Sequence, residues 1–339
     1  MIGSFAFMSL VWGATWLAMK LGVATVPPVF FGGTRFLVAG LLLLLLAIFR
    51  GEARRFTRRD LGRLLLVQLL IVILTYAPLF WGILHVPSGL TAVLDLTLMP
   101  VSLIGFGIAL GEENWSLGRA LALGFGFAGL AVLFGPQAVM PTDPLGLLGA
   151  AAIVFSAVVY SLGSVVARPL TKTTNATFLS GITMLPGGLI LTLGAWAFEP
   201  GARAPAWFDW SAAAWGAWLF LVVFGSLVAF TTYLRLIAAW GPARAGSYAY
   251  VSPVIAVLLG VVALHEHLGL RDGFGMSLLL VARFLLTENF YLQTTSPDNL
   301  WIGTGRSSTT PAKQRFVSRR SSTSPQSYGA EFVNYAPSE

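Results

Sequence analysis

Long apolar runs dominate this sequence of 339 residues, and they leave few ways for it to fold. A helix of about 20 apolar residues crosses the hydrocarbon core of a bilayer. Only 10% of the residues are charged, against about a quarter in an average soluble domain. We therefore predict an all-α integral membrane protein with ten transmembrane helices, at about residues 3–23, 27–49, 61–83, 87–109, 117–135, 144–167, 176–198, 212–234, 243–264 and 270–287.

Two stretches of the chain follow the same plan. When Pro100 is aligned with Pro253, Glu113 aligns with Glu266 without a gap. The chain therefore divides into two related five-helix repeats, residues 1–137 and 138–286. Because five is an odd number, the second repeat is predicted to be inverted relative to the first, as in many secondary transporters with a substrate site near the midplane.

The positions of the arginines predict the orientation. The connection after the second predicted helix is rich in arginine (Arg50, Arg54, Arg55, Arg58, Arg59 and Arg63), and such loops stay in the cytoplasm. Both termini are then cytoplasmic, in a multi-pass protein of the cytoplasmic membrane. The basic residues act as topology markers, so we expect the lipid bilayer and no nucleic acid as a partner. Whether the protein is a monomer or a dimer stays open.

The last part of the chain, residues 287–339, differs in character. It is rich in Ser, Thr, Pro and Arg and has no apolar periodicity, which predicts a disordered tail. The preceding motif ENFYLQ is similar to a rearranged protease-site linker, so a tag or a sequence artefact is the alternative origin of this segment.

Asp95 and Arg35 are ionisable residues inside predicted spans, at nearly the same depth. Such residues usually face a bundle interior or a cavity. We predict that they form an ion pair; it either locks two helices together or leaves Asp95 to bind substrate or a proton. A nearby Arg35 would hold Asp95 charged and so disfavour proton coupling. Lys20 is a competing partner, although its place near a helix end favours snorkelling.

Prolines lie inside several predicted spans, among them Pro78, Pro100, Pro186 and Pro253. Proline removes a backbone donor and kinks a helix. These positions are candidate hinges for alternating access, and a static kink that only shapes packing is the alternative.

Aromatic and hydroxyl residues lie well inside several spans, whereas Trp and Tyr are most common at membrane interfaces. A midplane cavity with aromatic walls and few charges suits a small amphipathic or zwitterionic solute, or a planar organic cation. The predicted substrate-binding residues are Trp12, Thr15, Trp16, Tyr76, Trp81, Asp95, Tyr160, Tyr233, Tyr248 and Tyr250.

The sequence offers no pattern for an enzyme. It has no cysteine, and His265 and His267 are two residues apart, so they would diverge on a helix and make a poor metal site. The GFGFAG match to a dinucleotide fingerprint lies within an apolar span with no preceding strand. We therefore expect no metal, no cofactor and no catalytic residue.

The motifs WGATW, PPVFFGGTRFLVAG and the paired P-x12-E segments together resemble the EamA-type branch of the drug/metabolite transporter superfamily. The resemblance implies a ten-helix secondary transporter that exports small metabolites by alternating access through a central cavity. Amino acids, including aromatic ones, are the implied cargo, as in the YddG-like amino-acid exporters. A multidrug or organic-cation exporter, or a nucleotide-sugar or sugar-phosphate exchanger, is the alternative. Arg283, in the tenth predicted helix, departs from the pattern.

Overall fold

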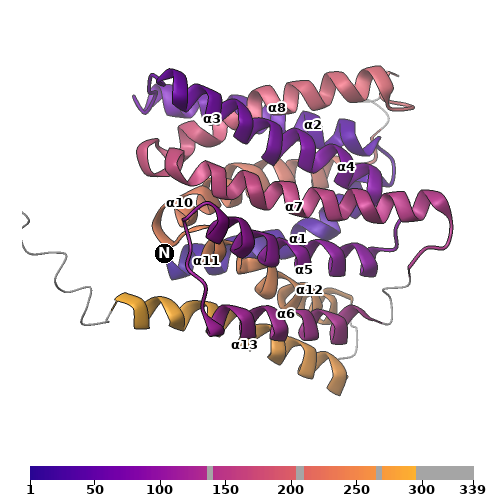
Figure 1. The fold of residues 1–339 in the computed structure, drawn as a ribbon. Helices are drawn as coiled ribbons and strands as arrows, with labels where there is room; N and C mark the ends of the chain where they lie inside the picture. The colour runs from indigo at the N-terminus through magenta and orange to yellow at the C-terminus, as the bar shows by residue number, and fades with distance from the viewer. Residues whose placement is uncertain (136–139, 204–209, 265–268, 295–339) are drawn as a thin grey trace, which may run out of the picture. The chain divides into compact units, whose positions relative to one another are not determined.

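The computed structural model describes residues 1–135, 140–203, 210–264 and 269–294, and all the regular secondary structure in these residues is helical. Most elements are α-helices, and η1 and η3 are π-helical segments (Figure 1). In chain order the elements are α1 (Ile2–Val23), α2 (Pro28–Phe49), α3 (Arg58–Gln68), η1 (Leu69–Ile73), α4 (Leu74–Gly82), α5 (Ser88–Ala109), α6 (Leu117–Phe134), α7 (Pro144–Thr173), α8 (Ala176–Phe198), α9 (Ala212–Phe220), η3 (Leu221–Phe230), α10 (Thr231–Trp240), α11 (Pro242–Gly246), α12 (Tyr248–Leu264) and α13 (Leu270–Thr294).

Eight helices among the described residues are long and apolar enough to cross a membrane. They coincide with the first eight predicted spans; the third is continuous from α3 through η1 to α4, and the eighth from α9 through η3 to α10. The remaining two predicted spans are helical but are not among these eight. The first is divided into α11 and α12, and the second, α13, carries Arg271, Asp272 and Arg283. Ten crossings therefore stay a prediction.

The boundary predicted for the C-terminal tail was wrong by several residues. Helix α13 continues to Thr294, so residues 287–294 are helical. The rest of the predicted tail, residues 295–339, lies outside the described residues, as do His265, Glu266 and His267.

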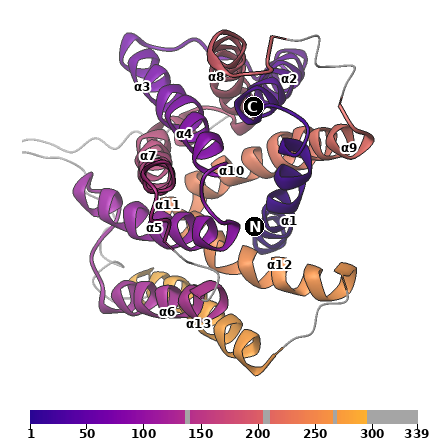
Figure 2. The same ribbon diagram turned by 90° about the vertical axis from the view of Figure 1, so that its right-hand side faces the viewer.

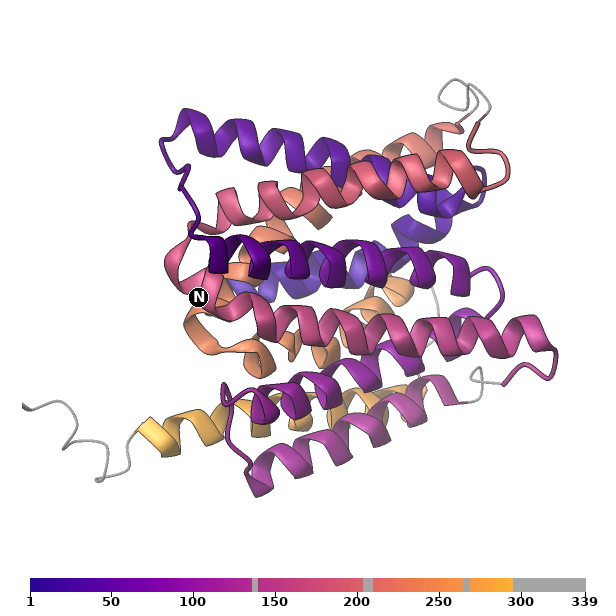
Figure 3. The same cartoon turned by 45° about the horizontal axis from the view of Figure 1, so that its top comes forward.

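The long helices run side by side in Figure 1, and Figure 2 shows some of them, such as α7 and α8, nearly end-on. Helix α2 packs along α8, α5 along α7, and α6 along α13, the last pair being visible together in Figures 2 and 3. We call the end where α1 begins the inner end and the end where α1 finishes the outer end. Helix α5 also packs against α6, whereas α2 packs mainly along α8.

Glycines allow α2 and α8 to approach each other closely. A Cβ atom built at Gly40 in α2 would overlap the backbone nitrogen of Leu185 in α8, and one built at Gly188 in α8 would overlap that of Leu37 in α2. Small residues at such contacts bring helix backbones into van der Waals range, where membrane helices gain most of their association energy. This contact fixes the position of α2, the helix that carries Arg35.

A carboxylate joins the same two helices at the outer end. Glu199, just after α8, accepts hydrogen bonds from the backbone N–H groups of Val29 (2.9 Å) and Phe30 (2.8 Å) at the start of α2. These donors have no partner within the helix, so the carboxylate acts as a cap and also complements the helix dipole. Burial raises the pKa of Glu199, and these two hydrogen bonds oppose the rise.

An ion-pair cluster joins several helices at the inner end. Glu113 pairs with Arg119 at 2.6 Å, and Glu112 pairs with Arg168 at 2.8 Å. Glu113 also accepts a hydrogen bond from the backbone of Ala243, so it connects the α5–α6 turn to the start of α11. Burial raises the pKa of the Glu113 carboxyl, and Arg119 and Arg168 oppose the rise.

The turn beside this cluster requires glycine. Gly241 has φ +87°, and a Cβ there would lie 2.8 Å from a carboxylate oxygen of Glu113. Both the left-handed backbone and the missing side chain allow the turn to approach the acid.

The glycine contact predicts a position-specific loss of stability. We expect Gly188→Ala to lower the free energy of unfolding in detergent micelles by about 1–3 kcal/mol, because the added methyl group overlaps backbone that cannot move aside. Gly194→Ala is the matched control, since a Cβ at this position of α8 meets nothing within 4 Å. Equal stabilities for the two variants would show that α2 and α8 are not in close contact.

The inner ion pair predicts a measurable coupling energy. In a double-mutant cycle of Glu113→Ala and Arg119→Ala, we expect a coupling of about 1–3 kcal/mol, because both side chains are largely buried. The more exposed pair Arg54–Asp60, at 3.4 Å, serves as the control and should couple by less than about 1 kcal/mol. Denaturant titration in micelles measures both, and a coupling near zero for Glu113 and Arg119 would contradict the proposed role of this pair.

Candidate functional site

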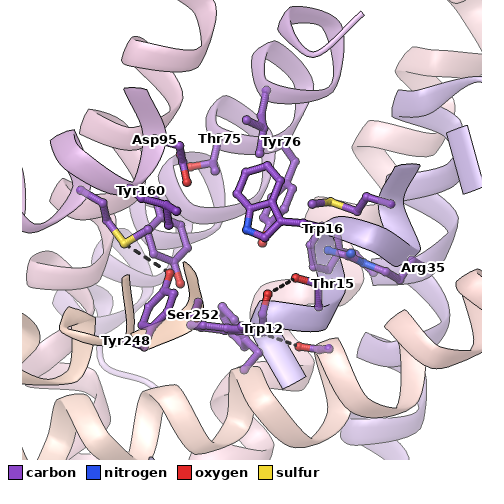
Figure 4. A pocket seen from close by; sticks show the side chains of 17 residues that line it. Trp12, Thr15, Trp16, Arg35, Thr75, Tyr76, Asp95, Tyr160, Tyr248 and Ser252 are labelled. Carbon is purple, nitrogen blue, oxygen red and sulfur yellow. Dashed lines mark hydrogen bonds between the residues drawn. The ribbon is translucent and has the colours of Figure 1, made fainter. Parts of the chain in front are cut away.

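A cavity of about 90 Å³ lies between the helices. Figure 4 shows the 17 side chains that line it. They come from α1, α2, α4, α5, α7, η3 and α12, and thus from both halves of the chain. The cavity reaches toward the outer end, since Met19 lies near the end of α1 and Leu79 near the end of α4.

Helix α1 presents one face to this cavity. Trp12, Thr15, Trp16 and Met19 line it at intervals of three and four residues, which is the spacing of one helical face. The indole N–H of Trp12 donates to the carbonyl of Gly225 in η3 at 3.2 Å, and the hydroxyl of Thr15 donates to the carbonyl of Trp12 at 2.7 Å. Trp12 is thereby held against the second half of the chain.

The facing wall comes from α4 and α5. Thr75, Tyr76 and Leu79 line the cavity from α4, and Asp95 and Met99 are among those that do so from α5. The π-helical segment η1 precedes this part of α4, and π segments often occur at functional sites. The hydroxyl of Thr75 donates to the carbonyl of Leu70 within η1 at 2.7 Å. This bond satisfies a carbonyl at the point where the helix changes its winding.

Aromatic side chains close the inner side of the cavity. The ring of Trp12 lies 4.3 Å from that of Tyr248 and 5.2 Å from that of Tyr233, measured between centroids, and the rings of Tyr160 and Tyr233 are 5.8 Å apart. Aromatic pairs at such distances attract each other. Further toward the inner end, Met8 is fully buried, so the packed core continues below the cavity.

The hydroxyls of this aromatic cluster have partners. Tyr233 donates to the hydroxyl of Ser164 at 3.0 Å, and Tyr248 donates to the sulfur of Met99 at 3.2 Å. These bonds fix the orientation of two rings without using a charged group.

The predicted ion pair between Arg35 and Asp95 does not form. Both residues line the cavity, but neither takes part in the ion pairs found within 4.0 Å among the described residues. The Arg35 guanidinium instead lies over the rings of Phe36, at 4.2 Å from the centroid, and Tyr76, at 5.4 Å. The prediction failed because equal depth does not bring two helices together: α2 packs along α8, whereas α5 packs along α7.

Asp95 is buried and has no cationic partner among the residues that the structure describes. Its exposed fraction is 8%, and in Figure 4 its carboxylate lies near Thr75 and Tyr160, across Trp16 and Tyr76 from Arg35. Lys20, the alternative partner, is exposed and does not line the cavity. The expectation that proton coupling is disfavoured rested on an ion pair between Arg35 and Asp95, and the structure does not show that pair.

Seven of the ten predicted substrate-binding residues line the cavity: Trp12, Thr15, Trp16, Tyr76, Asp95, Tyr160 and Tyr248. Tyr233 lies one layer behind them, fully buried against Trp12, Tyr160 and Tyr248.

Trp81 and Tyr250 lie away from the cavity, in contrast to the prediction. Trp81 is 37% exposed and contacts His85, while Tyr250 packs where Gly126 of α6 leaves room. Helix geometry explains both: at about 100° per residue, Trp81 points well away from Tyr76, five residues earlier, and Tyr250 points away from Tyr248.

The prolines predicted as hinges are next to residues that line the cavity. Pro78 precedes Leu79, Pro100 follows Met99 and Pro253 follows Ser252. Each lies inside a helix, in α4, α5 and α12 respectively. A bend at any of them would move a wall of the cavity, but their role as hinges stays a proposal.

Several lining residues were not predicted from the sequence: Met19, Arg35 as a lining side chain, Phe36, Thr75, Leu79, Leu96, Met99, Gly225, Phe230 and Ser252. Helical spacing could have found some of them, because Met19 is three residues from Trp16 and Met99 is four from Asp95. Gly225 and Phe230 lie in or at the end of η3, where a π-helical winding changes which residues share a face. No sequence pattern indicated that winding.

Comparison with solved structures supports the fold. A protein of known crystal structure aligns with a TM-score of 0.69 at 21% identity, covering 86% of this chain and 98% of the other. At that identity the likeness concerns the fold alone.

Curated relatives are similar over most of the chain. An inner membrane transporter of uncharacterized function from Escherichia coli, YedA, is 29% identical over 301 residues, which cover 88% of this chain and 94% of YedA. The uncharacterized transporter YoaV of Bacillus subtilis is 23% identical over 283 residues, covering 84% of this chain and 95% of YoaV.

The model of the EamA-like transporter family matches residues 2–135 and 147–287. These ranges include all the residues that line the cavity. The chain is thus a membrane transporter and belongs to the EamA-like transporter family.

Proposed function

We propose that this protein is a secondary transporter that exports small metabolites, above all amino acids including aromatic ones, across the cytoplasmic membrane. The observation that carries the proposal is the cavity with aromatic walls, lined from both halves of the chain. Its volume, about 90 Å³, lies below the range of about 300–1,000 Å³ that encloses drug-sized ligands. The cavity as it stands therefore suits a small solute.

The proposed mechanism is alternating access between two inverted five-helix repeats with ten crossings. The two ranges matched by the family model, 2–135 and 147–287, agree closely with the proposed repeats, 1–137 and 138–286. Pro78, Pro100 and Pro253 are the proposed hinges, and both termini are proposed to face the cytoplasm. The name of YedA as an inner membrane transporter supports the proposed membrane.

The inner and outer ends differ in a way that fits this mechanism. The cavity lies toward the outer end, while the inner end is joined by Glu113, Arg119, Glu112 and Arg168. Export requires the cavity to open at the inner end as well, so these contacts would have to separate during the cycle.

An organic-cation exporter is the second candidate, and it is favoured by Asp95, which lines the cavity and forms no ion pair with the described residues. A sugar-phosphate or nucleotide-sugar exchanger fits less well. A phosphate needs converging cationic donors, whereas Arg35 is the one Lys or Arg among the described lining residues and lies over two aromatic rings.

The proposal predicts which aromatic substitutions impair transport. In proteoliposomes, Trp16→Ala and Tyr76→Ala should each raise the half-saturation concentration for phenylalanine efflux about tenfold, because each removes a ring from the cavity wall; tenfold corresponds to about 1.4 kcal/mol. Trp81→Ala is the matched control, since Trp81 shares α4 with Tyr76 but faces outward. If efflux by all three variants equals that of the unaltered protein, the cavity is not the substrate site.

A further inference from the structure

Asp95 is a carboxylate in an environment that does not neutralise it. Its exposed fraction is 8%, and no ion pair reaches it from the described residues. A buried ionised carboxylate is costly unless a cation or several hydrogen bonds compensate it. No hydrogen bond from the described side chains or backbone reaches Asp95 either, so its charge has to be offset by a proton or by a cationic group of a solute in the cavity.

The cations of the described residues form no ion pair with Asp95. Arg35 is directed to the rings of Phe36 and Tyr76, on the other side of Trp16 and Tyr76 from Asp95 in Figure 4. Lys20 is exposed and outside the lining. The remaining ion-paired cations, such as Arg119, belong to clusters outside the lining.

The surfaces around Asp95 favour a cation. Trp16, Tyr76, Tyr160 and Tyr248 line the same cavity, and aromatic faces attract ammonium groups through the quadrupole of the ring. A carboxylate beside several ring faces is a site where an ammonium gains both a charge-assisted hydrogen bond and ring contacts. An anion in this position would be repelled by the carboxylate and by the faces of the rings.

The rest of the lining near Asp95 is apolar. Leu96 and Met99 follow it in α5, and Leu79 faces the cavity from α4. A solute whose ammonium reaches Asp95 can therefore place a hydrocarbon or aromatic group against these side chains. The site is built for an amine with an apolar substituent.

We infer that Asp95 binds the protonated amine of the cargo, which makes ammonium-bearing amphipathic solutes the substrate class. This inference rests on the proposed function, because it assigns a role within the same cavity. The substrate class includes amino acids and organic amines and excludes anionic cargo that lacks an amine. The competing role for Asp95 is to carry a proton.

The test compares three ligands that differ by one charged group each: phenylalanine, phenethylamine and 3-phenylpropanoate. Binding is measured by isothermal titration calorimetry on the full chain in micelles. We expect both amines to bind about 10- to 100-fold more tightly than 3-phenylpropanoate, the range expected for a hydrogen bond to a charged group. An equal or reversed order in the unaltered protein would overturn the inference without any variant.

Variants then assign the preference to Asp95. Asp95→Asn should reduce the difference in affinity between the amines and 3-phenylpropanoate to within about threefold, because the side chain keeps its shape but loses its charge. Asp95→Glu should retain part of this difference in affinity, because it keeps the charge. Asp60→Asn is the matched control, because Asp60 is on α3, pairs with Arg54 and is outside the lining. Asp95→Glu also provides a second variant if Asp95→Asn does not fold.

Flux measurements separate the inference from the proposed function. If phenylalanine efflux is normal and Asp95→Asn keeps the full preference for amines, Asp95 is not the amine site although transport stands. If Asp95→Asn keeps that preference but no longer responds to a pH gradient, Asp95 carries a proton and the inference is wrong. If no amine or amino acid is transported by the unaltered protein, the proposed function itself fails.

Discussion

Hydrocarbon cannot solvate polar groups, and this constraint shapes the interior of the bundle. A polar side chain within a span has to turn toward other helices or toward a cavity. Asp95, Arg35 and the hydroxyls of Tyr233 and Tyr248 all follow this rule. Their positions on separate helices, rather than a single motif, bring the polar atoms to one region. The cavity exists where these polar and aromatic faces meet without filling the space completely.

Packing of the helix pairs decides which of those polar groups meet. The glycines of α2 and α8 allow a backbone contact, and Glu199, just after α8, caps the start of α2. This arrangement holds α2 on the far side of the cavity from α5. Arg35 therefore lies over aromatic rings, and Asp95 forms no ion pair with the described residues. A structural contact with no ligand-binding role thereby sets the chemistry of the site.

The sequence allowed a good prediction of the helices and a partial prediction of the site. Apolar runs predicted the bounds of helix α1 to within a residue or two, because hydropathy is a local property of the sequence. Position along a span indicated that Trp12, Trp16 and Tyr160 lie well inside the membrane, but it carried no information on rotation about the helix axis. The predictions that Trp81 and Tyr250 line the site were wrong for that reason, because each faces away from a lining residue on its own helix.

Composition and periodicity alone determined that this chain is a helical membrane protein. Apolar runs of this length span a bilayer, and within the bilayer a helix satisfies its own backbone hydrogen bonds. They also indicated that Asp95 faces the interior of the bundle, because exposing its carboxylate to lipid would cost free energy whatever the surrounding fold. Only the tertiary structure decided that Asp95 has no arginine partner among the described residues and that the π-helical segment η3 borders the cavity. Those outcomes depend on which helices pack together and how each is rotated, and these are set by contacts between residues far apart in the chain.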